Sequence, residues 1–103
     1  MQSVYLKFYA TEKQRHNGML LYEWLLEEAK KLGVHGGSVF RAIAGFGRHG
    51  RLHNESFFEL AGELPVQVEF MLDTVLADKL LETLRTHKLN LFYVRYAVES
   101  GIL

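Results

Sequence analysis

Pro65-Val66-Gln67-Val68-Glu69-Phe70-Met71-Leu72, with the residues that follow, is the stretch that decides the fold. From residue 66 onward apolar side chains alternate with others, a period of two that is typical of a β-strand with one buried face. After residue 72 the period changes, and apolar residues fall on one side of a helix: Leu76, Ala77, Leu80, Leu81 and Leu84. Asp73 or Thr74 is suited to cap that helix. The pattern therefore predicts a strand that leads directly into a helix.

The first third of the chain repeats this plan. Apolar residues from Val4 to Ala10 alternate with Tyr5, Lys7 and Tyr9, which predicts a first strand. Residues 18–32 follow with helical spacing of the apolar side chains: Tyr22, Leu25, Leu26, Ala29 and Leu32. Asn17 is expected as the N-cap of this helix and Gly33 as its C-terminal stop.

The segments between and after these elements predict further strands. Residues 37–45 are predicted as a second strand, and a polar loop follows that is expected to close with a short strand at 56–60. Residues 91–98 read as the last strand. The order is β-α-β-β-α-β, so we expect an α+β, ferredoxin-like sandwich with an antiparallel sheet and two helices on one face. Residues 1–103 are expected to form a single domain.

The two faces of this predicted sheet differ in what covers them. The helices are expected to cover one apolar set: Val4, Leu6, Phe8, Val66, Val68, Phe70 and Leu72. The other face shows Tyr5, Tyr9, Met71 and one of two sets from the last strand. These sets are Phe92, Val94, Tyr96 and Val98, or Leu91, Tyr93 and Ala97. Either set makes the face too apolar for exposure to water, so the sequence predicts oligomerisation through it.

Composition narrows the class of protein. The chain of 103 residues carries 12 basic and 12 acidic residues, which gives no electrostatic reason to expect a nucleic-acid or membrane-surface binder. It contains no cysteine, so it has no disulfide framework, thiolate nucleophile or cysteine-ligated zinc. No signal-peptide pattern and no apolar run of membrane-spanning length is found, and a cytoplasmic protein is expected.

A glycine-rich stretch at 45–51, Gly-Phe-Gly-Arg-His-Gly-Arg, directly follows the second predicted strand. Glycines let the main chain approach a ligand closely, and Arg48 and Arg51 offer charged forks suited to phosphate. The spacing of Gly45, Gly47 and Gly50 also fits a dinucleotide-binding pattern, but no helix follows the loop as that site requires. The stretch is interpreted as an anion site, with a purely structural turn as the alternative.

Motifs spread along the chain resemble those of a known family. They are Gly18 with Tyr22-Glu23, Gly36-Gly37-Ser38-Val39-Phe40-Arg41-Ala42-Ile43-Ala44-Gly45-Phe46-Gly47, Arg51-Leu52-His53 and Leu64-Pro65-Val66. On these residues the chain resembles, over nearly its whole length, the PII-like proteins of domain of unknown function 190 (DUF190). It is more distantly similar to the PII nitrogen-regulatory signalling proteins, through Gly45-Phe46-Gly47-Arg48 and Leu64-Pro65.

The resemblance implies a homotrimer that binds an adenine nucleotide (AMP, ADP or ATP) in clefts between subunits. Residues 46–62 would form an effector loop that docks on a membrane transporter or channel, or on an enzyme. The implied ligand-binding residues are Gly45, Phe46, Gly47, Arg48, Arg51, His53, Arg41, Glu12 and Arg95. Glu12 and Arg15 resemble an acidic-basic pair of the family, and Glu69 is an alternative partner for Arg41. One departure is that residues 86–90 lack the glycine-rich phosphate loop of PII proteins.

Other functions are less well supported. His49, His53 and Glu55 suggest a metal-binding or hydrolytic protein, but their segment is not helical and does not fix the spacing of metal ligands. An RNA-recognition fold shares the element order, yet the third strand lacks the required aromatics and carries Glu69. No residue pattern indicates an enzyme. His16, His35 and His87 fall in predicted turns and indicate no site.

Overall fold

The computed structural model of the protein describes residues 2–45, 53–54 and 65–103. In this part of the chain two helices and eight strands follow one another. In chain order they are β1 (Gln2–Thr11), β2 (Arg15–His16), β3 (Met19–Leu20), α1 (Leu21–Lys31), β4 (Gly37–Arg41), β5 (Ala44–Gly45), β6 (His53–Asn54), β7 (Pro65–Leu72), α3 (Thr74–Thr86) and β8 (Tyr93–Glu99).

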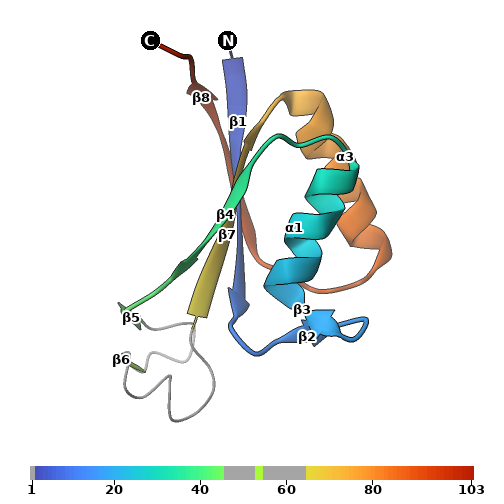
Figure 1. Ribbon diagram of the computed structural model, residues 1–103, viewed down its shortest axis with the longest axis vertical. Helices are drawn as coiled ribbons and strands as arrows, with labels where there is room; N and C mark the ends of the chain where they lie inside the picture. The colour runs from blue at the N-terminus through green and yellow to red at the C-terminus, as the bar shows by residue number, and fades with distance from the viewer. Residues whose placement is uncertain (1, 46–52, 55–64) are drawn as a thin grey trace.

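The main sheet has the strand order β4-β7-β1-β8, and every neighbouring pair is antiparallel. Both helices lie on the same face of this sheet (Figure 1). The expected α+β, ferredoxin-like arrangement is therefore confirmed. Because Gln2 pairs with Glu99, both chain ends lie at one end of the sheet, opposite to β5 and β6 (Figure 1).

The hydrophobic core fills the space between the helices and this face. Leu6 pairs with Phe70 and Phe8 with Val68, so alternate residues of β1 and β7 point toward the helices together. All residues of the predicted set on these two strands are buried: Val4, Leu6, Phe8, Val66, Val68, Phe70 and Leu72. The predicted stripe of α3 is confirmed as well, because Ala77, Leu80, Leu81 and Leu84 are buried and Leu76 packs against them. Asp73 caps α3, accepting a hydrogen bond from the Leu76 amide at 2.8 Å.

The start of the first helix differs from the prediction. Helix α1 begins at Leu21, and its N-cap, Leu20, makes no side-chain capping bond. Asn17 and Gly18 instead form the two-residue turn between β2 and β3, with φ of 50° and 80°. Asn-Gly is the preferred pair for such a hairpin because both residues need positive φ. The prediction of Asn17 as a cap was thus wrong, while Gly33, at φ 93°, ends the helix as expected.

The second predicted strand is divided in two. Strand β4 stops at Arg41, and the amide of Ala42 makes a last bond to the Pro65 carbonyl at 2.9 Å. Strand β5 then leaves the main sheet and pairs with β6, Ala44 opposite Asn54 and Gly45 opposite His53. The reason is that β7 begins at Pro65, which has no N–H, so the ladder has no further donor to offer on that strand. The strand predicted at 56–60 lies outside the described residues.

The register of the last strand settles which of its residues face away from the helices. Tyr5 pairs with Tyr96, and Lys7 with Val94. The first of the two alternative sets, Phe92, Val94, Tyr96 and Val98, therefore lies on the open face. Strand β8 begins at Tyr93, two residues later than predicted, after a connection in which Lys88 and Asn90 adopt φ of 52° and 56°.

Candidate functional site

Two charged residues of the implied site meet at the end of the sheet that carries β5 and β6. The guanidinium of Arg41, at the end of β4, donates to the carboxylate of Glu12 at 2.5 Å. Glu12 directly follows β1, and the contact passes the start of β7, which lies between these two strands. Arg41 is half exposed, and a guanidinium carries five N–H donors, so it retains donors for an anion beside Glu12.

The pairing of these charges departs from two expectations. Glu12 is bound by Arg41 and not by Arg15, whose guanidinium donates to the Gly18 carbonyl at 3.3 Å. Glu69 is not the partner of Arg41, because it lies 3.9 Å from the amine of Lys7 on the open face. The sheet register explains this, since Arg41 pairs with Val66 on the helix-covered face and Glu69 alternates to the other side.

The glycine-rich stretch begins at the β5–β6 ribbon. Gly45 closes β5, and its main chain pairs with that of His53. Phe46, Gly47, Arg48 and Arg51 lie outside the described residues, so their place in a site stays a prediction. The described main chain places Gly45 and His53, the residues that flank 46–52, side by side.

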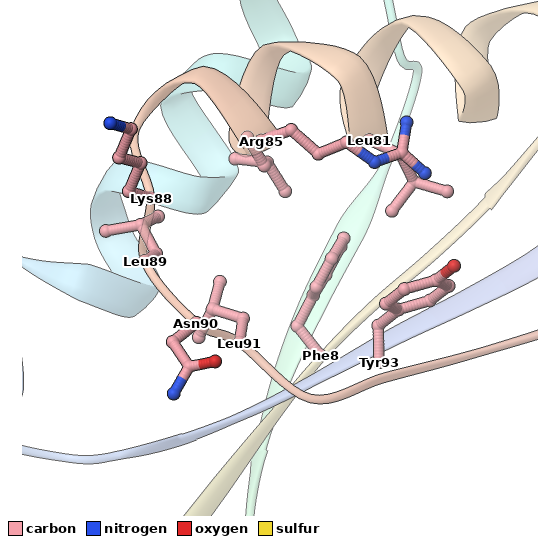
Figure 2. A pocket seen from close by; sticks show the side chains of 9 residues that line it. Phe8, Leu81, Arg85, Lys88, Leu89, Asn90, Leu91 and Tyr93 are labelled. Atoms are coloured by element: carbon pink, nitrogen blue, oxygen red, sulfur yellow. The ribbon is translucent and has the colours of Figure 1, made fainter.

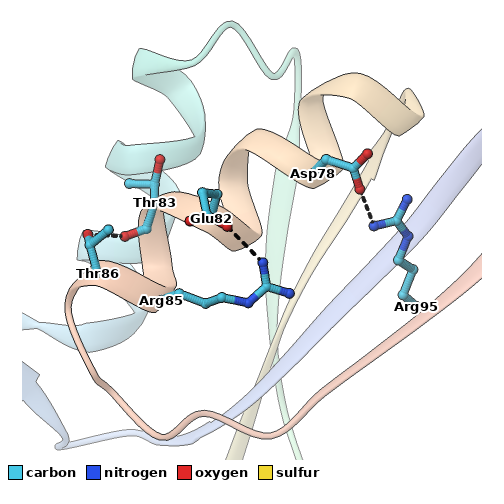
Figure 3. A network of polar contacts seen from close by, with 6 residues as sticks. All are labelled: Asp78, Glu82, Thr83, Arg85, Thr86 and Arg95. Carbon is cyan, nitrogen blue, oxygen red and sulfur yellow. Dashed lines mark hydrogen bonds and ion pairs between the residues drawn. The ribbon is translucent and has the colours of Figure 1, made fainter.

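Arg95 does not join this group within one chain. It lies on β8, opposite Leu6, and its guanidinium donates to Asp78 of α3 at 2.6 Å (Figure 3). Strands β8 and β4 are the two edges of the sheet, about 14 Å apart at three strand spacings. A second ion pair on α3 joins Arg85 to Glu82 at 3.0 Å (Figure 3). Within one chain, Arg41 and Arg95 therefore lie at opposite edges of the sheet.

A cavity of about 250 Å³ lies between the end of α3 and the sheet. The rings of Phe8 and Tyr93 face it from the sheet, and Leu81 and Arg85 from the helix (Figure 2). The connection from α3 to β8 closes it with Lys88, Leu89, Asn90 and Leu91. This connection stands where PII-like resemblance would put a glycine-rich loop, and two of its residues hold the left-handed backbone that glycine would favour.

The open face of the sheet carries stacked aromatic rings. Tyr5 and Tyr96 stack with centroids 4.9 Å apart, and Tyr9 and Phe92 lie 5.5 Å apart. The amine of Lys7 lies 5.5 Å from the Tyr5 ring and 5.9 Å from the Tyr9 ring. Burial raises the pKa of Tyr5 above its ordinary value, and the hydrogen bond from its hydroxyl to the Glu69 carboxylate raises that pKa further. This face thus combines exposed aromatics with one partly buried charge pair.

One further cluster, of two histidines and a tryptophan, was not predicted from the sequence. His16, in β2, and His87, the C-cap of α3, meet with Nε2 and Nδ1 3.2 Å apart. Both rings contact Trp24 of α1, at centroid distances of 4.4 Å and 4.7 Å. The two histidines are 71 positions apart, so no local pattern connects them.

The described residues contain neither a larger cluster of metal-binding side chains nor a membrane-spanning helix. Within residues 2–45, 53–54 and 65–103, no group of three or more His, Cys, Asp or Glu side chains is placed to hold a metal ion. No helix in the same residues is long and apolar enough to cross a membrane.

The strand order and the two helices on one face define a ferredoxin-like sandwich, and a PII-like protein of known structure shares it. The solved structure of CPII, a nitrogen regulatory PII-like protein from Thiomonas intermedia K12 bound to ADP, AMP and bicarbonate, superimposes with a TM-score of 0.72. The match covers 99% of this chain and 91% of CPII at 13% sequence identity, so it is a likeness of fold.

The chain belongs to the family of domain of unknown function 190 (DUF190), described as uncharacterized ACR, whose model matches residues 3–99. The UPF0166 protein of Aquifex aeolicus is 35% identical over 80 residues, which cover 78% of this chain and 76% of that protein. The UPF0166 protein of Methanocaldococcus jannaschii is 33% identical over 64 residues, 62% of this chain and 58% of that protein. The resemblance to this family that the motifs indicated is confirmed.

Proposed function

We propose that this protein is a homotrimeric, PII-like regulator that binds an adenine nucleotide between subunits and signals through residues 46–62. The observation that carries the proposal is the arrangement at the β4 edge, where Arg41, Glu12 and the β5–β6 ribbon lie together at the base of the glycine-rich stretch. CPII, which shares the fold, was solved with ADP and AMP bound, and this supports the choice of ligand class.

The open face supports the assembly. Large apolar side chains gather there, and four of their aromatic rings contact one another in two pairs, Tyr5 with Tyr96 and Tyr9 with Phe92. The set is Tyr5, Tyr9, Phe40, Met71, Phe92 and Tyr96. Phe92 is 69% exposed and Met71 50%, a combination that favours burial against another copy of the chain. Soluble homo-oligomers close by rotational symmetry, and a trimer would place an edge of each sheet beside its neighbour.

Assembly would also bring together the two basic residues that lie apart in one chain. Arg41 and Arg95 lie on opposite edges of one sheet, but an edge of one copy lies beside an edge of the next when copies are arranged in a ring. A nucleotide between copies would then meet the glycine-rich stretch and Arg41 of one chain and Arg95 of another. Arginine forks bind phosphate oxygens through charge-assisted hydrogen bonds.

The phosphate side of such a site would differ from that of PII proteins. The connection after α3 has no glycine, although Lys88 and Asn90 adopt left-handed backbone angles. Fewer main-chain donors than a glycine loop offers would favour ligands with fewer phosphates. Ligand binding would order residues 46–62, so the affinity for a transporter, channel or enzyme partner would depend on nucleotide state through linkage.

The test is isothermal titration of the purified protein with ATP, ADP, AMP and cyclic AMP, with and without Mg²⁺. We expect saturable binding near one ligand per chain, and a loss of affinity in the Arg48→Ala/Arg51→Ala double variant. The matched control is Lys30→Ala/Lys79→Ala, which removes two exposed basic residues from the helices. Light scattering on each variant checks that the assembly is intact.

The outcomes separate the parts of the proposal. Absence of heat and of thermal stabilisation with all four nucleotides would overturn nucleotide binding and leave the assembly to be judged by mass alone. Equal affinity in the two double variants would remove the glycine-rich stretch from the site. A monomeric mass at micromolar concentration would overturn the trimer.

A further inference from the structure

The cluster of His16, Trp24 and His87 lies where the β2–β3 hairpin meets the end of α3. Its two imidazole nitrogens, Nε2 of His16 and Nδ1 of His87, face each other at 3.2 Å. The nucleotide site proposed above uses none of these side chains. A contact between two imidazoles is compatible with an N–H···N hydrogen bond, but it also has the geometry of a chelate.

We propose that His16 and His87 together bind a divalent transition-metal ion of the Zn²⁺, Ni²⁺ or Cu²⁺ class. The ion would join the β2–β3 hairpin to the end of α3, and this site is independent of nucleotide binding.

The distance between the two nitrogens fits this ion class. An imidazole nitrogen binds Zn²⁺ at about 2.0–2.1 Å. Two nitrogens that are 3.2 Å apart and both at that distance from one ion subtend an angle of about 100° at the metal. This lies between the angle of cis ligands in an octahedron, about 90°, and that of a tetrahedron, about 109°. Each N-to-metal direction then lies about 40° from the N···N line, so both rings must turn from their hydrogen-bonded orientation to direct their lone pairs at the ion.

Trp24 packs against both imidazole rings. Trp24 is 5% exposed and contacts each imidazole edge-to-face, with interplanar angles of 71° to both His16 and His87. The rings are also nearly perpendicular to each other, at 83°. A fixed aromatic platform reduces the side-chain entropy that two histidines would lose on binding an ion.

Electrostatics at the end of α3 favour a cation. His87 is the C-cap of the helix, where unpaired carbonyls carry the partial negative charge of the helix dipole. On the last helical turn Arg85 is paired with Glu82 at 3.0 Å, and the exposed Lys88, next to His87 in the chain, is the basic residue whose charge opposes a cation there. A metal ion at His87 would thus lie against the favourable end of the helix.

The ligand set restricts which ions can bind. The described residues hold no larger group of metal-binding side chains, so the protein would supply two nitrogens and water the remaining positions. Imidazole suits Zn²⁺, Ni²⁺ and Cu²⁺, whereas Mg²⁺ and Ca²⁺ require oxygen ligands. Because the two histidines are 71 positions apart, an ion that binds the native pair stabilises the folded chain.

The single tryptophan of the chain makes the site directly observable. Untagged protein is titrated with NiCl₂ while Trp24 fluorescence is recorded, because Ni²⁺ quenches an indole in its immediate vicinity. We expect saturable quenching with one ion per chain, a higher melting temperature, and displacement of Ni²⁺ by excess ZnCl₂. MgCl₂ should change neither signal. Either His16→Gln or His87→Gln should lower the affinity for Ni²⁺ by about tenfold or more, because only one of the two histidine ligands remains.

Two control variants locate the ion. His35→Gln removes an exposed histidine elsewhere, and His49→Gln/His53→Gln removes the pair considered above as a metal site; both should keep the affinity of the parent protein. Parent-like quenching in both His16→Gln and His87→Gln overturns the proposal, as does the absence of quenching up to millimolar NiCl₂. So does quenching that depends on His49 and His53 alone. Melting curves without metal verify that each variant is folded, and if one is not, the other decides.

Discussion

The two faces of the four-stranded sheet use the same strands for different purposes. On the helix-covered face, Leu6, Phe8 and Phe70 are buried within one chain. On the open face, Tyr5 and Tyr96 stack on each other, and Met71 beside them is half exposed. The covered face is buried within a single copy, and the open face keeps large apolar side chains exposed. Stability of the fold and association of copies are therefore expected to respond to different substitutions.

The largest effect is expected on the covered face. Phe8 is buried and meets the Phe70 ring edge-on at 6.3 Å, so Phe8→Ala should lower the free energy of unfolding by about 3–5 kcal/mol. Urea unfolding followed by far-UV circular dichroism measures this loss. The control is Val75→Ala on the exposed side of α3, expected within about 0.5 kcal/mol of the parent. Similar losses in both variants would contradict a core at this position.

The open face is tested by charge. Met71→Glu combined with Tyr96→Glu introduces two carboxylates into the proposed contact between copies, and burying unpaired charges is costly. We expect light scattering to report a fall from the trimer mass to the monomer mass, while the helical circular dichroism signal is retained. Val75→Glu, on the helix layer, should leave the mass unchanged. An unchanged mass in the double variant would show that this face is not the interface.

Gly37 sharpens the comparison at the edge of the covered face. A Cβ at this position would lie 2.5 Å from Cε1 of Phe70 and 3.1 Å from Cδ2 of Leu26, and the Phe70 ring is buried. Gly37→Ala should therefore cost about 1–3 kcal/mol through overpacking, measured as a shift in urea midpoint. Gly36→Ala is the matched control because a Cβ there meets nothing within 4 Å. If the two variants are equally stable, the Phe70 ring yields without cost.

The smallest expected effect concerns Tyr5 at alkaline pH. Its pKa is raised in the folded protein, so the folded state keeps a proton that the unfolded chain releases near pH 10. Its contribution to stability is thus present below about pH 10 and declines as the pH rises beyond it. Between about pH 8 and about pH 11 the urea midpoint should fall further for the parent protein than for Tyr5→Phe, which lacks the ionisable hydroxyl. A steeper fall in Tyr5→Phe would reverse the sign.

The elements whose hydrophobic pattern repeats several times were predictable from the sequence, and the two-residue strands were not. Strands β1 and β7 and helix α3 each bury one face, so apolar residues recur along them at the spacing of a strand or a helix. Strands β2 and β3 have two residues each, too few for a period, and Asn17-Gly18 is compatible with either a cap or a hairpin turn. The Asn-Gly pair was the available signal for the hairpin.

The contacts of the candidate site depend on the register of strand pairing in the main sheet. Local sequence patterns do not predict that register. Arg41 and Glu12 are 29 positions apart, and their meeting requires β7 to start at Pro65 between the strands that carry them. The same holds for His16 and His87, which meet only because the end of α3 returns to the hairpin. The roles of Phe46, Gly47, Arg48 and Arg51 in ligand binding remain predictions, because these residues lie outside the described part of the chain.

The pairing of Gln2 with Glu99 brings the start of β1 and the end of β8 side by side. Its two ends lie at the end of the sheet opposite to the β5–β6 ribbon (Figure 1). A short linker between the ends, with new termini cut within residues 46–62, would give a circular permutant that retains every strand pairing of the main sheet. A fluorescent domain fused before β1 or after β8 would likewise lie away from the ribbon and report on its partners without covering it.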